Sequence, residues 1–118
     1  HGIDVFYSVE LPEIFSFVHP VGTVLGNAKY SDYFVVYQNC TVGSTKEGLY
    51  PNFDTAVALY AGARVIGNCN IGTNTIFGAC SFIIDTDVQS NKIILNSFPE
   101  NKIIENTNSV IKTCFNDN

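Results

Sequence analysis

His19 is the side chain best suited to move a proton near neutral pH, because the only other histidine among the 118 residues is His1. A neutral imidazole can remove a proton from a reacting hydroxyl and return it later in the reaction. A single histidine beside proline in an apolar stretch is also a common structural residue, either packed or half exposed. The residue types alone leave both readings of His19 open.

The same composition argues against several other kinds of chemistry. A catalytic zinc ion generally takes three protein ligands, often histidines, so the sequence predicts no metal site. The formal charge is −5, and the six Lys and Arg residues are scattered along the chain. No basic stripe is present to neutralise a phosphate backbone, so we expect no nucleic-acid partner.

Hydropathy and cysteine usage indicate a cytoplasmic protein. No apolar run is long enough to cross a membrane, and the amino end lacks a signal-peptide pattern, so we expect no membrane partner. The content of 46% hydrophobic and 14% charged residues suits one ordered domain. Cys40 and Cys69 fall in the apolar pattern, while Cys80 and Cys114 show no metal-binding spacing, so reduced thiols are expected.

A six-residue apolar period predicts the scaffold that must position these groups. Hexapeptide repeats that coil into a parallel β-helix need this period, which fits neither a helix nor an alternating strand. One row comprises Phe53, Leu59, Val65, Ile71, Phe77 and Ile83, and a smaller row comprises Val57, Ala63, Cys69, Thr75 and Ser81. The rhythm extends upstream through Val42, Val36, Tyr30 and Leu25, with one residue missing between the last two, and through Phe17 and Leu11.

The predicted organisation is an all-β domain over residues 1–95 with roughly five coils, followed by a capping tail over 96–118. Residues 44–52 are polar and contain Gly and Pro, which predicts a loop extruded from a corner of the solenoid. Such loops tend to line the binding face. Residues 93–95 are expected to add a last strand, and residues 101–118 a capping strand or a short helix.

Three segments resemble the hexapeptide-repeat acyltransferases, in particular the serine O-acetyltransferases and the polysaccharide-cluster O-acetyltransferases. Residues 19–28 (HPVGTVLGNA) resemble the block H-A-T-G-x-V-x-G-E-T. Residues 36–43 (VYQNCTVG) are similar to I-L-Q-x-V-T-L-G, and residues 61–68 (AGARVIGN) to A-G-A-K-I-L-G-N. The resemblance extends to about Ile104. It implies a left-handed parallel β-helix and a homotrimer with active sites between subunits.

The resemblance also implies acetyl-CoA as the donor and direct transfer to the hydroxyl of a small-molecule acceptor. His19 would be the base, and Asp4, fifteen residues earlier, would orient the imidazole. Without the resemblance, Asp4 reads as a solvated carboxylate at a corner. Backbone N–H groups of Gly43 and Ser44 would stabilise the oxyanion.

For the donor, the resemblance places the pantetheine arm along Ala61, Gly62, Gly78 and Ala79. Small residues allow an extended chain to approach the backbone closely. Small residues also fill solenoid corners for packing reasons alone, so either role explains them.

Two departures from the family pattern concern the acceptor. Val18 stands where serine acetyltransferases have an aspartate, and Leu49 and Tyr50 replace an Arg-His pair. A site for the charged groups of serine should offer charge to each. A neutral, hydroxyl-rich acceptor recognised by Gln38, Tyr50 and Asn52 suits the remaining groups at least as well.

Three functions therefore remain open. The first is a serine-acetyltransferase-like O-acetyltransferase. The second is an acetyltransferase that acts on a sugar or amino sugar of a polysaccharide precursor, and the third is a non-catalytic trimeric assembly subunit. The first two share the base and differ in the acceptor, whereas the third requires neither His19 nor acetyl-CoA.

Overall fold

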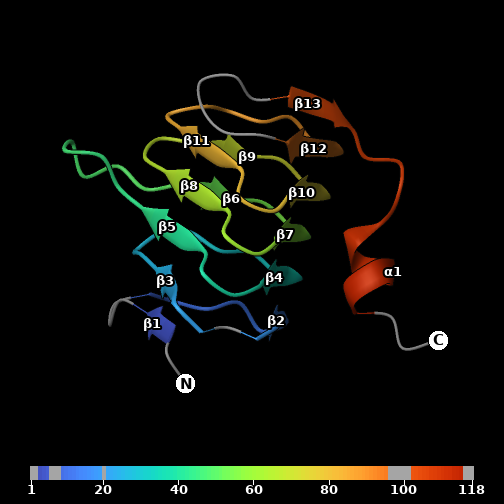
Figure 1. The fold of residues 1–118 in the computed structure, drawn as a ribbon, viewed down its shortest axis with the longest axis horizontal. Coiled ribbons are helices and arrows are strands. Elements are labelled where there is room, and N and C mark those ends of the chain that lie inside the picture. Colours follow the sequence, from blue (N-terminus) through green and yellow to red (C-terminus); the bar gives the residue numbers. More distant parts are fainter. Residues whose placement is uncertain (1–2, 6–8, 20, 96–101, 116–118) are drawn as a thin grey trace.

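A computed structural model describes residues 3–5, 9–19, 21–95 and 102–115, and it shows a β-solenoid with a short C-terminal helix (Figure 1). Sheet A comprises β1 (Ile3–Val5), β3 (Thr23–Leu25), β5 (Thr41–Gly43), β8 (Arg64–Ile66) and β11 (Phe82–Ile84) in that order. Sheet B comprises β2 (Phe15–Phe17), β4 (Phe34–Val36), β7 (Val57–Leu59), β10 (Thr75–Phe77), β12 (Lys92–Leu95) and β13 (Lys102–Glu105). Sheet C contains β6 (Asn52–Phe53) and β9 (Asn70–Ile71), and α1 is Val110–Cys114.

The predicted all-β solenoid is confirmed. The strands pair in parallel from turn to turn, except that β13 runs antiparallel to β12. Five parallel strands stack in sheet A and five in sheet B, one from each of the roughly five predicted coils, and they make a solenoid of about 4 turns. The chain after Leu95 then returns as β13, antiparallel to β12.

The two repeat rows form the core, as predicted. Every residue of both rows is buried with at most 2% of its surface exposed. Successive members of the larger row belong to sheets C, B and A in rotation, so each points inward from a different side of the solenoid. Side chains stacked at intervals of one turn fill a narrow interior, which makes burial the main stabilising term.

Strand register locates the two irregularities of the repeat. Val42 pairs with Val65 and Phe53 pairs with Ile71, so the chain from Val42 to Phe53 is longer than the paired stretch from Val65 to Ile71. The excess falls between β5 and β6, where the loop was predicted over residues 44–52, except that Asn52 belongs to β6 because it pairs with Asn70. Lys29 and Asn70 are equivalent because both pair with Asn52, and Leu25 and Val65 are equivalent because both pair with Val42. Lys29 lies four residues after Leu25, whereas Asn70 lies five residues after Val65, which confirms the missing residue.

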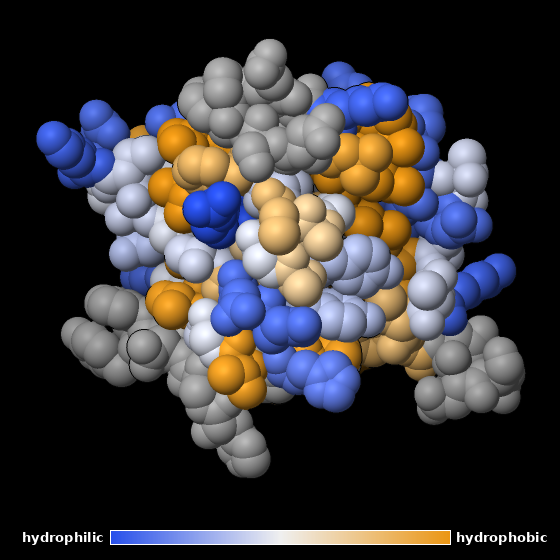
Figure 2. Space-filling view, viewed as in Figure 1, coloured by the Kyte–Doolittle hydropathy of each residue, from blue (hydrophilic) through white to orange (hydrophobic). Residues whose placement is uncertain are grey.

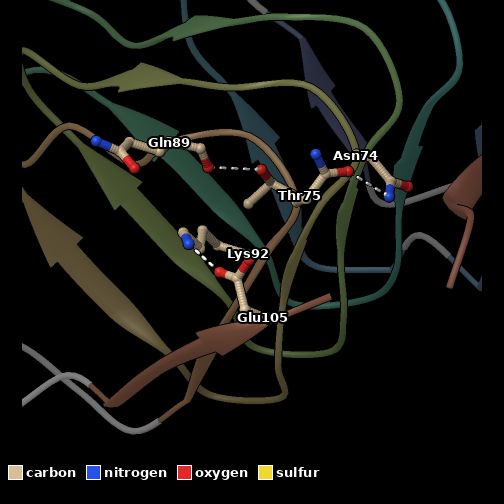
Figure 3. Close-up of polar contacts among 6 residues, drawn as sticks. Asn74, Thr75, Gln89, Lys92 and Glu105 are labelled. Carbon is tan, nitrogen blue, oxygen red and sulfur yellow. Dashed lines mark hydrogen bonds and ion pairs between the residues drawn. The ribbon is translucent and has the colours of Figure 1, made fainter. Parts of the chain in front are cut away.

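The C-terminal tail provides both of the predicted elements, a strand and a helix. The Lys92 ammonium pairs with the Glu105 carboxylate between β12 and β13 (Figure 3). Helix α1 then packs on the outer face of sheet B, where Val110 is buried beside Val35 and Ala58. Of the predicted tail, residues 96–101 and 116–118 lie outside the described residues.

Asn74 fastens this tail to the solenoid. Its Oδ1 accepts a hydrogen bond from the backbone N–H of Val110 at 2.8 Å, and its Nδ2 donates to the carbonyl of Asn108 at 3.0 Å. Nδ2 also donates to Asn91 Oδ1 at 3.0 Å, a contact drawn in Figure 3. Asn106 Nδ2 donates to the backbone carbonyl of Asn74 at 3.0 Å. Four hydrogen bonds thus converge on one residue.

Replacing Asn74 by Asp is expected to lower the free energy of unfolding by about 1–2 kcal/mol, because the carboxylate keeps the acceptor for Val110 but loses the amide donor. Asn74→Ala should cost more, about 2–3 kcal/mol, since it also removes the oxygen that accepts from the Val110 N–H and places alanine at a φ of 58°. Chemical denaturation measures both values. Equal stability of the three proteins would contradict the role of Asn74.

The structure reports two further properties of the described residues. Cys40 and Cys69 are buried thiols, as the repeat predicted, and burial raises the pKa of each. In the described part of the chain, no helix is both long and apolar enough to span a membrane.

Candidate functional site

His19 lies at the corner where the chain passes from sheet B to sheet A, which we call the B–A corner. It follows β2 and precedes β3, and its side chain is exposed. Its φ is 47°, in the left-handed region that non-glycine residues seldom adopt, and its carbonyl accepts from the N–H of Val21 at 2.9 Å. Seven other described non-glycine residues have a positive φ, among them Asn39 and Cys80 in later turns of the same corner, so this conformation is a property of the solenoid corners.

The corner that contains His19 is longer than the one stacked above it. Phe17 pairs with Val36 before the corner, and Val24 pairs with Thr41 after it. The stretch from Phe17 to Val24 contains two more residues than the stretch from Val36 to Thr41. The N–H of Val18 donates to the carbonyl of Val36 before the excess, and the N–H of Asn39 donates to the carbonyl of Val21 after it. The additional length therefore falls between Val18 and Val21, the stretch that contains His19.

Asp4 lies on the strand next to the one that His19 precedes. The backbone of Asp4 in β1 pairs with Val24 in β3. This register brings the predicted partner to sheet A near the B–A corner. The Asp4 side chain lies outside the described part of the structure, so its contact with the His19 imidazole stays a prediction.

Gln38 occupies the same corner one turn above His19. Its side chain is partly buried, and its Oε1 atom is buried without a hydrogen-bond partner among the described residues. A buried amide oxygen without a partner costs about 1–3 kcal/mol, so an incoming donor such as a hydroxyl would be bound favourably there. This atom is the clearest sign of an acceptor position in the corner.

The four residues predicted to contact the donor lie along the B–A corner of the next two turns, and we call them the donor strip. The N–H of Gly62 donates to the carbonyl of Gln38 at 3.0 Å, and the N–H of Cys80 to that of Ala61 at 2.9 Å, so successive corners stack in register. Ala61, Gly62 and Ala79 are at least partly exposed. Gly78 is buried, and an added Cβ would lie 2.9 Å from Leu95 Cδ2 and 3.1 Å from the Ile94 carbonyl oxygen, so packing favours a glycine here.

The remaining predicted residues lie elsewhere in the chain. Gly43 ends β5 at the opposite edge of sheet A from the B–A corner, and Ser44 follows it into the extruded loop. In Figure 1 this loop extends at the upper left, whereas α1 lies at the right. One copy of the chain therefore does not bring Gly43 and Ser44 to His19.

Tyr50 and Asn52 lie beyond the loop, at the corner between sheets A and C. The Tyr50 ring rests on Gly26, where an added Cβ would lie 2.7 Å from Tyr50 Cε1. Burial raises the pKa of the nearby Tyr30, whose hydroxyl donates to the Gly26 carbonyl at 2.8 Å. Asn52 faces a polar groove of about 650 Å³ on sheet C, together with Asn70. These two predicted acceptor residues are thus separated from Gln38 within one chain.

An aromatic pair at the B–A corner was missed in the sequence. The rings of Tyr37 and Tyr60 meet edge to face, with centroids 5.0 Å apart. Burial raises the pKa of the Tyr60 hydroxyl, and the neighbouring Cys114 and Tyr37 raise it further. Both tyrosines directly follow a core residue at the end of a sheet B strand, so reading the position after each repeat would have revealed the pair.

Comparison with known proteins identifies serine acetyltransferases. A serine acetyltransferase from Synechococcus elongatus is 33% identical over 87 residues, which span 70% of this chain and 36% of the relative. The match to the serine acetyltransferase structure from Vibrio cholerae covers 97% of this chain and 46% of the Vibrio chain, with a TM-score of 0.82 at 21% sequence identity. The Brucella abortus enzyme, solved in complex with coenzyme A, has a TM-score of 0.77 at 22% identity and covers 89% of this chain and 42% of its own.

No protein-family model matches the chain. The chain spans less than half the length of the serine acetyltransferases that it matches. The sequence relatives and the structural neighbours nevertheless agree, and the repeat rows and sheet order account for the shared fold. The chain is therefore a homologue of the serine acetyltransferases, with the β-solenoid of a hexapeptide-repeat acyltransferase.

Proposed function

We propose that the protein is an O-acetyltransferase that uses acetyl-CoA and a small hydroxyl-bearing acceptor. The observation that carries the proposal is the B–A corner, where an exposed histidine lies in an extended corner below the orphaned Gln38 Oε1. The donor strip continues the same corner toward the C-terminal turns. The likeness to serine acetyltransferases, one of them solved with coenzyme A, supports the choice of donor.

The proposed reaction is one direct acyl transfer. The His19 imidazole takes the proton of the acceptor hydroxyl while the oxygen attacks the thioester carbonyl. The tetrahedral intermediate collapses with cleavage of the C–S bond, and the imidazolium returns the proton to the departing thiolate. The products are the acetyl ester and CoA. Asp4 would hold the imidazole in the required tautomer and stabilise its charged form.

The acceptor is proposed to be neutral and rich in hydroxyl groups. Val18, beside His19, is partly buried against the apolar cluster under α1, and Leu49 is an exposed apolar residue. Neither can pair with the ammonium or carboxylate of serine, whereas the Gln38 amide can bond to a hydroxyl. A sugar is therefore favoured over serine as the acceptor, with an amino sugar as the related alternative.

A complete site is proposed to need a second copy of the chain. Gly43 and Ser44, proposed to supply N–H donors to the oxyanion, and Tyr50 and Asn52, proposed to bind the acceptor, lie away from His19 in one chain. A homotrimer with sites between subunits would bring a loop of one copy to the B–A corner of the next. Mixing an inactive His19 variant with an inactive loop variant should then restore part of the activity.

The direct test measures release of CoA from acetyl-CoA with the full protein. The acceptor panel contains serine, homoserine, simple sugars and amino sugars, each compared with a reaction without acceptor. Acceptor-dependent release with a sugar supports the proposal, and preference for serine corrects the acceptor. The non-catalytic assembly subunit predicts a stable oligomer with no acceptor-dependent release from any compound.

Replacing Gln38 by Leu tests the proposed acceptor position. The change removes the orphaned amide at similar volume, so it should raise KM for the acceptor about tenfold while the KM for acetyl-CoA stays near that of the wild type. Steady-state kinetics with each substrate varied in turn separates the two constants. The free energy of unfolding should stay equal or rise, because a buried unpaired oxygen is lost. A KM change confined to acetyl-CoA would contradict this role.

A further inference from the structure

The outer face of sheet A carries one cation beside the donor strip. Val24, Thr41, Arg64 and Phe82 are paired in register across β3, β5, β8 and β11, and they share one column of the sheet. Arg64 is exposed and lies only two residues beyond Gly62. Figure 2, in the view of Figure 1, shows apolar patches over the solenoid that adjoin hydrophilic groups. The column thus borders the donor strip on its sheet A side.

The Arg64 guanidinium is held in place by an aromatic ring. Its Cζ atom lies 4.6 Å from the centroid of the Phe82 ring, on the next turn. This cation–π contact restrains the Arg64 side chain. It also places the guanidinium beside β11, one turn closer to the C-terminal end of the solenoid than the Arg64 backbone in β8. Among the described residues, the one ion pair is that of Lys92 with Glu105, so the Arg64 charge is available to an anion.

The distance of the Arg64 guanidinium from His19 along the solenoid axis matches the expected length of the pantetheine arm of the donor. From β3, which follows His19, to β11, which carries Phe82, the sheet rises by three strand spacings. At roughly 4.8 Å for each spacing, this distance is about 14 Å. The pantetheine arm separates the thioester from the diphosphate of acetyl-CoA by a comparable length. With the thioester at His19 and the arm along the donor strip, the phosphates would emerge near Arg64.

We infer that Arg64 is the phosphate anchor of the CoA donor, an inference that rests on the proposed function. The donor strip itself contains no charged residue, whereas the donor is strongly anionic. A guanidinium offers paired N–H groups to phosphate oxygens, and its contact with Phe82 lowers the entropy lost on binding. Lys29 forms an isolated bridge with Asn52 beside sheet C, and Lys92 is already paired, so neither replaces Arg64 at this position.

The test compares two donors that differ in their phosphate groups. Arg64→Gln should raise KM for acetyl-CoA by about tenfold to a hundredfold, as expected for lost charge-assisted hydrogen bonds. KM for acetyl-pantetheine, which has no phosphate, should be unchanged. Arg64→Lys should give an intermediate KM for acetyl-CoA, because it retains the charge but not the paired geometry. Lys29→Gln is the matched control and should alter neither constant.

The outcomes separate this inference from the proposed function. An unchanged KM for acetyl-CoA, or an equal rise for both donors, overturns the role of Arg64 while the acetyltransferase stands. If the wild type turns over neither donor, calorimetric titration with CoA decides the inference. Binding of CoA that is weakened by Arg64→Gln but not by Lys29→Gln supports the anchor without the activity. Failure of the wild type to bind CoA overturns both.

Discussion

Replacing His19 by Asn is expected to lower kcat/KM for acetyl transfer by about 10²–10⁴-fold, the usual contribution of a positioned general base. Without the imidazole, no base removes the proton of the acceptor hydroxyl, which has a high pKa and is a weak nucleophile while it remains protonated. Most of the loss should appear in kcat, because the donor strip and Gln38 remain. Asparagine is the preferred replacement since it tolerates the positive φ of this position better than most residues.

Folding and donor binding serve as controls for the His19 variant. The side chain is exposed, so the free energy of unfolding should change by less than about 0.5 kcal/mol. The dissociation constant for CoA should also stay unchanged, since the donor strip and Arg64 are untouched. Acceptor-dependent CoA release at the wild-type rate would show that another group is the base. A variant that no longer binds CoA would reveal a structural role for His19.

Phe53→Ala is expected to lower the free energy of unfolding by about 3–5 kcal/mol, the range found for removing a buried aromatic side chain. Phe53 is fully buried where the extruded loop rejoins the solenoid. Its ring stacks on Tyr30, with centroids 5.5 Å apart, and contacts Phe34 at 5.2 Å. Removing it leaves a cavity between these two rings that backbone pairing on both sides prevents from closing.

Two matched variants show whether the loss comes from the core. Phe53→Leu retains most of the apolar volume and should cost clearly less than the alanine change. Phe15→Ala removes the same side chain from a position that is 39% exposed, at the edge strand β2, and should cost about 1 kcal/mol or less. Equal losses for Phe53→Ala and Phe15→Ala in chemical denaturation would contradict the assignment of the repeat row as the core.

The fold could be predicted from sequence because its information is local and repeated. Each buried position of the row from Phe53 to Ile83 recurs at the six-residue period, and every turn supplies another independent observation of the same pattern. The missing residue before Tyr30 and the loop before Phe53 were visible as breaks in that rhythm. The period does not show that β13 folds back on β12, because the pairing of these two strands is antiparallel and lies outside the repeat.

The candidate site was predictable only in part. His19 could be singled out because the sequence offers no comparable proton acceptor. The residues of the donor strip were predicted only through the resemblance to the hexapeptide-repeat acyltransferases, because small residues at corners are equally explained by packing. The packing of Tyr37 on Tyr60 could have been found from the position after each repeat, but the position of Cys114 beside them could not, since α1 lies outside the repeat. A contact between the repeat and a segment outside it does not produce a periodic pattern in the sequence.

By itself, the sequence determined the solenoid, its core rows, its extruded loop and the identity of the histidine that could act as a base. Only the tertiary structure decided that His19 lies in a corner two residues longer than the next, and that Gln38 Oε1 is buried there without a partner among the described residues. It also separated Tyr50 and Asn52 from that corner within one chain. Periodicity fixes which side of the solenoid a residue faces, whereas proximity across turns depends on strand register, which each insertion or deletion shifts.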